Sequence, residues 1–521
     1  MAEEVELKLA TDADSLARVA ELGLIRGMRT GGARDRHLVS TYHDTPDGAL
    51  KRAGMALRVR HDGERNVQTV KGPVAGTATG DALQHMREAD AEVAGPHPEI
   101  ASIPDAELRE RLNRDGIPDA LTPQFTTALD RRELEVTLHG SRIEVAIDSG
   151  EIVAGEARQS VNEVELELKD GDPAALHELG RMLAGYIPVR PVTRSKAARG
   201  HDLATGRLPP PMKAPKPALS PGVDVAEAFA THARACMRQI RANIEAVFAN
   251  PDPEGIHKLR VGLRRLRVIV DVFQPVMQAE HYAWLRGELR AFQRRIGPAR
   301  EWDVFVTETL AAMRHRLPEE DALAPLEHAA GGRRADANAA ASAAIADGHA
   351  THVLLTLEGW LHDGAWRAGG DADPVGRDAV AFARERLDAM VKKARKLGKK
   401  HHKLSDAKLH RLRIRLKKLR YTADAFAGLF PDGDSKTYLT RLETLQDTLG
   451  ALNDAATGDE LLAEIRPRLA DDQGASTATI ERAVGVARGW LAGQAARDLA
   501  ALPKAWSALA NTQPFWRDAR A

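Results

Sequence analysis

The feature that most constrains the fold is a change of hydrophobic period along this 521-residue chain. In the first two fifths, short segments alternate polar and apolar residues, for example residues 4–9, 142–148 and 163–169. A period of two is typical of β-strands with one apolar face. After residue 222 the pattern changes to Ala- and Leu-rich stretches of helical period. The chain is therefore expected to be multidomain, with a β-rich part followed by an all-α part.

A Pro-rich segment lies where the period changes. It is typical of an extended, semi-rigid linker, and 521 residues exceed what one compact core usually holds. We therefore expect three parts, which are a first domain over residues 1–204, a linker over 205–222 and a helical domain over 223–510.

Composition excludes several classes of protein. Cys236 is the single cysteine, so a disulfide framework is excluded and a reducing compartment is expected. The charged N-terminal segment does not resemble a signal peptide, and no apolar run is long enough to span a bilayer. These features predict a cytoplasmic protein without a membrane partner.

Charged residues in the first part follow the strand alternation. Glu4, Glu6 and Lys8 share one strand face, and Arg58 and Arg60 share another. A solvated sheet face is the common explanation of such alternation. However, whole strands here offer almost only carboxylates or only cationic groups. If these faces turn inward, the carboxylates would recruit Mg²⁺ or Mn²⁺ and the cationic groups would bind phosphate oxygens.

The helical part contains an internal repeat. Residues 257–267 match residues 410–420, an offset of 410 − 257 = 153, and residues 293–297 match 446–450 at the same offset. Two matches at one spacing indicate a duplicated helical bundle with pseudo-twofold symmetry.

Each copy of the repeat carries a row of basic residues on one helix face, opposite a row of leucines. The first stripe consists of His257, Arg260, Arg264 and Arg267. The second stripe consists of His410, Arg413, Lys417 and Arg420. A solvated helix face would normally interleave carboxylates, and neither stripe contains one. The stripes therefore favour a bound polyanion, with His257 and His410 either bonding phosphate or fixing a neighbouring helix.

An ordered series of motifs in the first part resembles the CYTH domain, the triphosphate tunnel metalloenzyme fold, over residues 1–204. The series begins with Glu4-x-Glu6-x-Lys8 and continues through residues 41–45, 57–60, 69–72, 143–150, 163–167 and 195–200. The resemblance implies an antiparallel eight-stranded β-barrel tunnel that hydrolyses short phosphate chains with divalent metal ions, Mg²⁺ or Mn²⁺.

The resemblance also implies roles for individual residues. The expected metal ligands are Glu4, Glu6, Glu144, Asp148, Glu163 and Glu165. The expected triphosphate-binding residues are Lys8, Arg58, Arg60, Lys71, Arg87, Arg131 and Lys196. A plain ion pair between Glu167 and Lys169 inside the tunnel is an alternative to a functional role for Glu167.

The helical part resembles the CHAD domain through its two stripe helices and the segment 442–454. This resemblance implies two pseudo-symmetric four-helix bundles beside a basic groove that binds long-chain polyphosphate. The expected partners are inorganic triphosphate and long-chain polyphosphate, and an association with polyphosphate granules would follow from the same binding.

Four other functions stay open. The same fold could hydrolyse thiamine triphosphate or a nucleotide, carry adenylyl cyclase chemistry, or act as a non-enzymatic polyphosphate-binding scaffold. A nucleic-acid binder would need stacking aromatics beside the basic residues. The chain has five tyrosines and ten phenylalanines, and Tyr421 is the only aromatic residue next to a stripe, which argues against nucleic acid.

Overall fold

A computed structural model gives the structure of the chain. The described residues are 3–61, 65–74, 82–114, 116–217, 219–220, 222–250, 252–368, 376–399, 404–430, 434–471 and 476–518. They form two compact units, each of which is described separately. The first unit contains Met1–Lys213, Met237–Leu259 and Ala343–Ala365, and the second contains Ala214–Cys236, Arg260–Ser342 and Trp366–Ala521.

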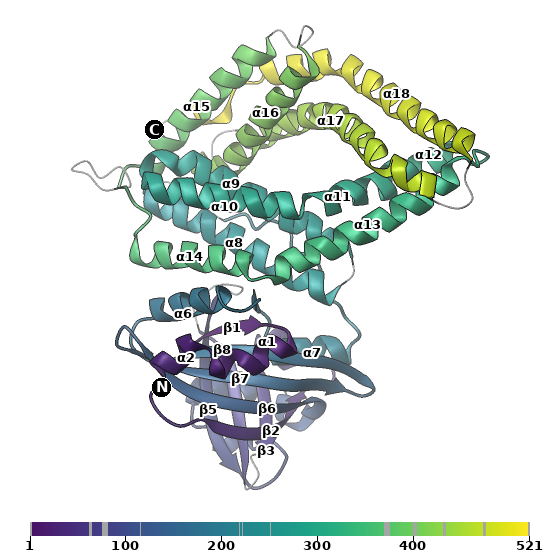
Figure 1. Cartoon of the computed structure of the whole chain (residues 1–521). Coiled ribbons are helices and arrows are strands. Elements are labelled where there is room, and N and C mark those ends of the chain that lie inside the picture. Colours follow the sequence, from purple (N-terminus) through teal and green to yellow (C-terminus); the bar gives the residue numbers. More distant parts are fainter. Residues whose placement is uncertain are drawn as a thin grey trace. The chain divides into compact units, whose positions relative to one another are not determined.

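The first unit contains an antiparallel sheet closed into a ring (Figure 1). Its strands are β1 (Glu3–Ala10), β2 (Arg34–Asp44), β3 (Ala56–His61), β4 (Asn66–Pro73), β5 (Leu83–Val93), β6 (Thr122–Leu138), β7 (Ser141–Ala154) and β8 (Ala157–Asp170). Their order is β5-β4-β3-β2-β6-β7-β8-β1, and a β1–β5 pairing closes the ring. The short strand β9 (Arg190–Pro191) pairs with the edge of β1. The predicted eight-stranded antiparallel barrel is confirmed.

The strand alternation decides which side chains face the interior of the barrel, called the lumen. Leu7 and Leu9 of β1 are buried in an apolar cluster with Leu176 and Leu179 of α6 (Ala174–Ala184). The packing is close, since a Cβ added at Gly180 of α6 would lie 2.6 Å from Leu7. Because successive side chains point to opposite faces, the charged residues between these leucines are directed into the lumen.

A short helix from the end of the barrel domain also contributes to the lumen. Helix α7 (Lys196–Ala204) begins after Ser195, whose hydroxyl accepts a hydrogen bond from the Ala198 N–H and so caps the helix. On another side of the barrel, α4 (Ala106–Leu112) packs Leu108 against the apolar face of the sheet. Each helix therefore packs an apolar side chain against the barrel, Ala197 from α7 and Leu108 from α4.

From Val225 onward the described chain is mainly helical, as predicted (Figure 1). The helices are α8 (Val225–Ala249), α9 (Glu254–Phe273), α10 (Ala279–Arg295), α11 (Gly297–Val304), α12 (Ala311–Arg316), α13 (Leu323–Ala346), α14 (His349–Asp363), α15 (Ala379–Gly398), α16 (Asp406–Phe426), α17 (Ser435–Asp471), α18 (Thr477–Ala510) and α19 (Phe515–Asp518). Among the described residues, none of these helices combines the length and apolarity that a bilayer span requires.

Two ion pairs in the second unit repeat the sequence duplication. Arg265 of α9 lies 3.5 Å from Asp424 of α16, and Lys418 of α16 pairs with Asp271 of α9. The offsets are 418 − 265 = 153 and 424 − 271 = 153. Each copy of the repeat therefore contributes the cation of one ion pair and the carboxylate of the other. Such a reciprocal exchange is the mark of a twofold relation. The predicted pseudo-twofold symmetry is thus present in side-chain contacts as well as in sequence.

Candidate functional site

The lumen of the barrel is a charged cavity of about 690 Å³. Most of the predicted site residues line it: Glu4, Glu6, Lys8, Arg58, Arg60, Lys71, Arg131, Glu144, Glu165 and Lys196. The exposed fractions of Glu4, Glu6 and Lys8 are only 8%, 3% and 7%. The hypothesis that opposite charges turn inward together is therefore confirmed, and the alternative of a solvated sheet face is excluded for these strands.

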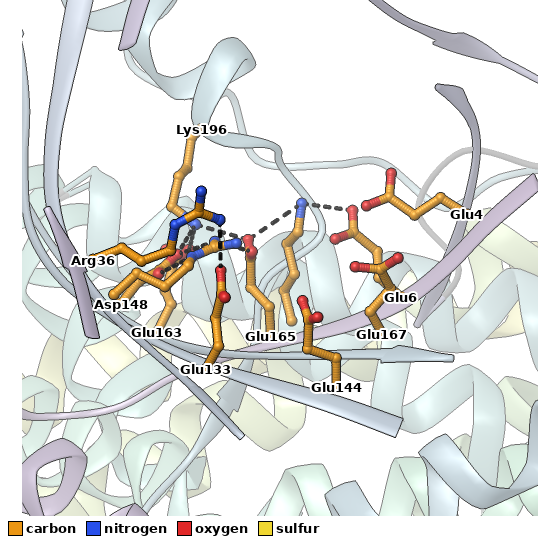
Figure 2. A network of polar contacts seen from close by, with 12 residues as sticks. Glu4, Glu6, Arg36, Glu133, Glu144, Asp148, Glu163, Glu165, Glu167 and Lys196 are labelled. Atoms are coloured by element: carbon orange, nitrogen blue, oxygen red, sulfur yellow. Dashed lines mark hydrogen bonds and ion pairs between the residues drawn. The ribbon is translucent and has the colours of Figure 1, made fainter. Parts of the chain in front are cut away.

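Four carboxylates gather on one side of the lumen. Figure 2 shows Glu4, Glu6, Glu144 and Glu167 close together, from strands β1, β7 and β8. The strand register explains this, because Glu167 lies opposite Glu6 on one neighbour and opposite Glu144 on the other. Burial, with the charges of Glu4 and Glu144 adding to it, raises the pKa of Glu167. Burial and neighbouring carboxylates thus both disfavour the charged form of Glu167.

Lysines accompany this carboxylate cluster. Lys169 lies 2.7 Å from Glu167 and 3.5 Å from Glu144, so the Glu167–Lys169 ion pair considered from the sequence is present. Lys8 lies 2.7 Å from Glu6, and Lys71 pairs with Glu4. Each ammonium group occupies a position beside oxygens that could otherwise ligate a cation.

A second set of carboxylates holds cations in place. Lys196 lies 2.7 Å from Glu165, 2.8 Å from Asp148 and 3.1 Å from Glu163. Arg131 donates two hydrogen bonds of 2.7 Å to Asp148 and another of 2.7 Å to Glu165. Asp148 and Glu163 are almost completely buried and do not line the cavity. These carboxylates fix the positions of two cations that do line it.

The electrostatics of this second set follow from its geometry. Burial alone would raise the pKa of the Asp148 carboxyl, but Lys196 and Arg131 outweigh burial and lower it. Burial would likewise lower the pKa of the Lys196 ammonium, but Asp148, Glu165 and Glu163 raise it. All of these groups are therefore held in their charged forms at neutral pH.

The two arginines of β3 have fewer close carboxylates. The neighbouring charge of Arg58, together with burial and Arg131, lowers the pKa of Arg60 to about 10. The Nε atoms of Arg58 and Arg60 are both buried without a hydrogen-bond partner in the described structure. A carboxylate oxygen of Glu88 lies 3.9 Å from the Arg58 guanidinium. This part of the lumen has unmet N–H donors and excess positive charge, which an anion would satisfy.

Arg87 is not brought to the lumen. It lies on β5 between Met86 and Glu88, which line the cavity from the other face of the strand. Its guanidinium lies 3.5 Å from Asp105 and pairs with Glu107, both at the beginning of α4. In the structure Arg87 therefore joins a strand to a covering helix.

Further lining residues were missed in the sequence. They are Arg34, Arg36, Tyr42, Glu88, Asp90 and Glu133. Arg36 lies 3.5 Å from Glu133, and Figure 2 shows this pair beside Asp148 and Lys196. Strand parity could have found some of them, since Glu133 is two residues after Arg131 and Arg36 shares the face of Tyr42.

The donor set fits a hard divalent cation by its chemistry. Glu4, Glu6, Glu144 and Glu167 supply only carboxylate oxygens, the ligands that Mg²⁺ and Mn²⁺ prefer. Within the described part of the chain, no three acidic, histidine or cysteine side chains converge at metal-binding geometry. A cation bound there would favour the charged form of Glu167, which burial and the charges of Glu4 and Glu144 disfavour.

The basic stripes lie on α9 and α16, with their leucines behind them. Leu259, Leu263, Leu412 and Leu416 have exposed fractions of 1% or less, as the helical period predicts. Arg260 lies 3.7 Å from Glu301, and its repeat counterpart Arg413 lies 3.9 Å from Asp454. Arg267 bonds the amide oxygen of Gln293, and Arg420 bonds that of Gln446 at 3.1 Å. Each contact is thus repeated at the offset of 153.

The two stripes act on each other electrostatically within the second unit. Burial, Arg264 and Arg413 lower the pKa of Lys417 to about 7. The pKa of Arg413 is also lowered, by burial and by the charge of Arg264. His410 lies 2.8 Å from the Asn453 side-chain oxygen, and His257 is half-buried in the first turn of α9. Arg264, Arg413 and Lys417 of the two stripes therefore form one region of crowded, like-signed charge within the second unit.

Two family models match the chain. One, described as the CYTH domain, matches residues 2–200, and the other, described as the CHAD domain, matches residues 231–463. The two matches lie on the barrel and on the helical repeat, respectively.

Individual proteins are similar to parts of the chain. An inorganic triphosphatase of Haemophilus influenzae is 31% identical over 169 residues, which are 32% of this chain and 46% of that protein. The chain thus matches about half the length of this curated relative. The crystal structure of the CHAD domain from Ricinus communis is 28% identical and covers 58% of this chain and 98% of its own, with a TM-score of 0.49. PptA from Streptomyces chartreusis is 18% identical and covers 55% of this chain and 100% of its own, with a TM-score of 0.43.

Proposed function

The chain joins a CYTH domain to a CHAD domain, and from this premise we propose that its barrel hydrolyses inorganic triphosphate with divalent metal ions, while its two basic stripes bind long-chain polyphosphate. One observation carries the first half of the proposal. The lumen contains a carboxylate cluster and also two arginines, Arg58 and Arg60, whose Nε atoms are buried without a hydrogen-bond partner in the described structure. A metal-bound phosphate chain is complementary to both at once.

The cationic side chains of the lumen would bind the phosphate chain. Arg58 and Arg60 offer buried, unpartnered N–H groups, and Arg131 and Lys196 are held in place by buried carboxylates. Fixed donors in a site shielded from water stabilise negative charge better than mobile donors in solvent. They would therefore stabilise charge that develops on the leaving phosphate oxygen as well as charge already present on the substrate.

The carboxylate cluster would hold the metal. When bound, Mg²⁺ or Mn²⁺ supplies Lewis acidity and a water of lowered pKa. Glu4, Glu6, Glu144 and Glu167 would supply the oxygen donors, and Lys169 would have to release two of them, Glu144 and Glu167. A metal role for Asp148, Glu163 and Glu165 stays a prediction, because Lys196 and Arg131 engage their oxygens in the structure.

Phosphate release from tripolyphosphate, ATP and thiamine triphosphate tests the first half, with Mg²⁺ or Mn²⁺ present. The Glu4→Gln, Glu6→Gln double variant should lose tripolyphosphate hydrolysis by about 10²-fold or more, a typical loss for removing a preorganised charge-stabilising group. Glu151→Gln, a half-exposed carboxylate of β7 that lies outside the cavity lining, is the matched control. Equal activity of wild type and double variant would refute the metal role.

The same assay separates the other functions. Faster release from ATP or thiamine triphosphate than from tripolyphosphate would change the substrate but keep the site. No release from any of them, with tripolyphosphate still bound, would favour a binding scaffold.

The polyphosphate half rests on the crowding of like charges. Burial and the charge of Arg264 lower the pKa values of both Lys417 and Arg413. A polyanion lying along the stripes would remove that repulsion and release counter-ions. The two copies would contribute equivalent contacts because the residues repeat at one offset.

A further inference from the structure

An aromatic residue that the proposed mechanism does not use lies in the wall of the lumen. Tyr42 of β2 lines the cavity and has an exposed fraction of 5%. Its ring stacks on Phe125 of β6, with centroids 4.6 Å apart and planes inclined by 15°. The two residues are cross-strand partners in the sheet register, so the stack is built into the barrel.

The outer side of the stack is fixed by helix α7. A Cβ added at Gly200 would lie 2.1 Å from the Phe125 ring, so the ring occupies the space that a side chain would need. His201 meets the same ring edge-on, with centroids 5.1 Å apart. Because α7 also begins with Lys196, one helix both positions a lumen cation and locks the aromatic stack.

The inner side of the stack ends at an arginine. Tyr42 and Arg58 are cross-strand partners in the β2–β3 register, and both line the cavity, so the phenol and the guanidinium are neighbours on one face of the sheet. Arg58 is otherwise 3.9 Å from Glu88 and is repelled by Arg131. A hydroxyl on a rigid ring is thus placed beside a guanidinium that also feels the like charge of Arg131.

We propose that Tyr42 is a positioning residue for triphosphate. Its ring is held by the stack on Phe125, which packs against Gly200, and its phenol directs Arg58 toward the phosphate chain. The affinity for the substrate decreases once the phenol loses its proton. The inference rests on the proposed triphosphatase function. The neutral phenol would orient the guanidinium without neutralising it. A phenolate would instead form an ion pair with Arg58 and compete with phosphate for the same N–H groups.

The surroundings of Tyr42 favour such a change at alkaline pH. The charged groups that face it or its arginine are Arg58 and Arg60 of β3, Arg131 of β6, Lys196 of α7, and Glu88 and Asp90 of β5. Burial would raise the pKa of Tyr42, but Arg58, Lys196 and Arg60 outweigh burial and lower it. A bound phosphate chain would offset those cations and raise the pKa of Tyr42 again. Substrate binding would therefore disfavour deprotonation of Tyr42, and deprotonation would weaken substrate binding.

Kinetics of Tyr42→Phe in the full chain test the proposal. The KM for tripolyphosphate should rise about tenfold at neutral pH, the size expected for losing a hydrogen bond to a charged group. The kcat should change less than the KM, because only binding is impaired. The wild-type KM should rise further at alkaline pH, and this rise should be absent in Tyr42→Phe. Tyr186→Phe, at an exposed tyrosine, should behave as wild type.

Tyrosinate absorbance gives a readout that does not depend on catalysis. The difference between wild type and Tyr42→Phe isolates one of five tyrosines. Its titration should lie below that of ordinary tyrosine at about 10 and move upward when tripolyphosphate is added without metal. Arg58→Gln should also move it upward, which keeps the test available if Tyr42→Phe does not fold.

The outcomes separate the two proposals. An unchanged KM and pH profile in Tyr42→Phe, or a titration at or above about 10 in wild type, would overturn the role of Tyr42. Absence of tripolyphosphate hydrolysis in wild type would overturn the proposed function instead. In that case the absorbance titration would still decide whether Tyr42 and Arg58 act together.

Discussion

The lumen of the barrel and the basic stripes of the helical repeat are both suited to phosphate chains, but their lysines have neighbours of opposite charge. In the lumen, Lys196 is surrounded by three carboxylates that raise its pKa. In the stripes, Lys417 lies among guanidinium groups, and burial together with those groups lowers its pKa to about 7. The direction of the lysine pKa shift therefore distinguishes the two regions.

The difference follows from the secondary structure that carries each region. A closed ring of strands places alternate residues from all neighbours in one small volume, so charges of both signs must be paired. A helix places every third or fourth residue on one face and leaves long cationic side chains half in solvent. The lumen can thus hold a ligand at a fixed position, whereas the stripes attract any chain of negative charge.

We expect the largest effect from removing the ammonium group at the centre of the charged network in the lumen. Lys196→Ala leaves Asp148, Glu163 and Glu165 buried together without their shared partner. Breaking a buried ion pair costs about 3–5 kcal/mol in free energy of unfolding. Hydrogen exchange of peptides from β6, β7 and β8 should therefore accelerate, and tripolyphosphate hydrolysis should be lost.

An exposed pair on the same strands provides the control for Lys196→Ala. Arg158 lies 2.5 Å from Glu151, and its side chain is 61% exposed. Arg158→Ala should change the free energy of unfolding by at most about 1 kcal/mol. Equal exchange rates in the two variants would show that the lumen network does not stabilise the barrel.

We expect the next largest effect from reversing the charge of two residues in the stripes. Arg264→Glu with Lys417→Glu should weaken binding of long-chain polyphosphate at physiological salt by about 10²-fold or more, since two attractive contacts become repulsive. The salt dependence of binding should also become shallower, by about one unit of the log–log slope for each lost contact. Tripolyphosphate hydrolysis in the barrel should not change.

A matched variant carries the same change of net charge outside the stripes. Arg482→Glu with Arg488→Glu alters two exposed residues of α18 that each already pair with a carboxylate. This variant should retain polyphosphate as wild type does at physiological salt. Similar losses in both double variants would mean that total charge, not the stripes, determines binding.

The sequence was sufficient to predict which way a side chain faces where the pattern of a single strand or helix decides this. The alternation at Glu4, Glu6 and Lys8 predicted an inward-facing charged strand, and the leucine spacing at Leu259 and Leu412 predicted the buried face of each stripe helix. These features depend on the parity or the period of one element. The structure confirms both.

Features that depend on neighbouring elements could not be predicted. Whether Arg87 faces the lumen depends on which face of β5 is covered by α4, and that contact joins distant parts of the chain. The contact of Tyr42 with Arg58 and the pair of Arg36 with Glu133 likewise depend on strand register. The sequence showed the carboxylates of the lumen but not which of them hold cations.

The smallest effect tests the opposite pKa shifts directly, through the pH dependence of polyphosphate binding. With a pKa of about 7, Lys417 is mostly charged at pH 6 and mostly neutral at pH 8. Binding of a polyanion favours the charged form, so wild-type affinity should fall about tenfold between these values. Lys417→Arg keeps the charge and should flatten the dependence, apart from any common contribution of His257 and His410. A parallel fall in wild type and Lys417→Arg would show that Lys417 does not lose its proton in this range, and the contrast between the two regions would then rest on geometry alone.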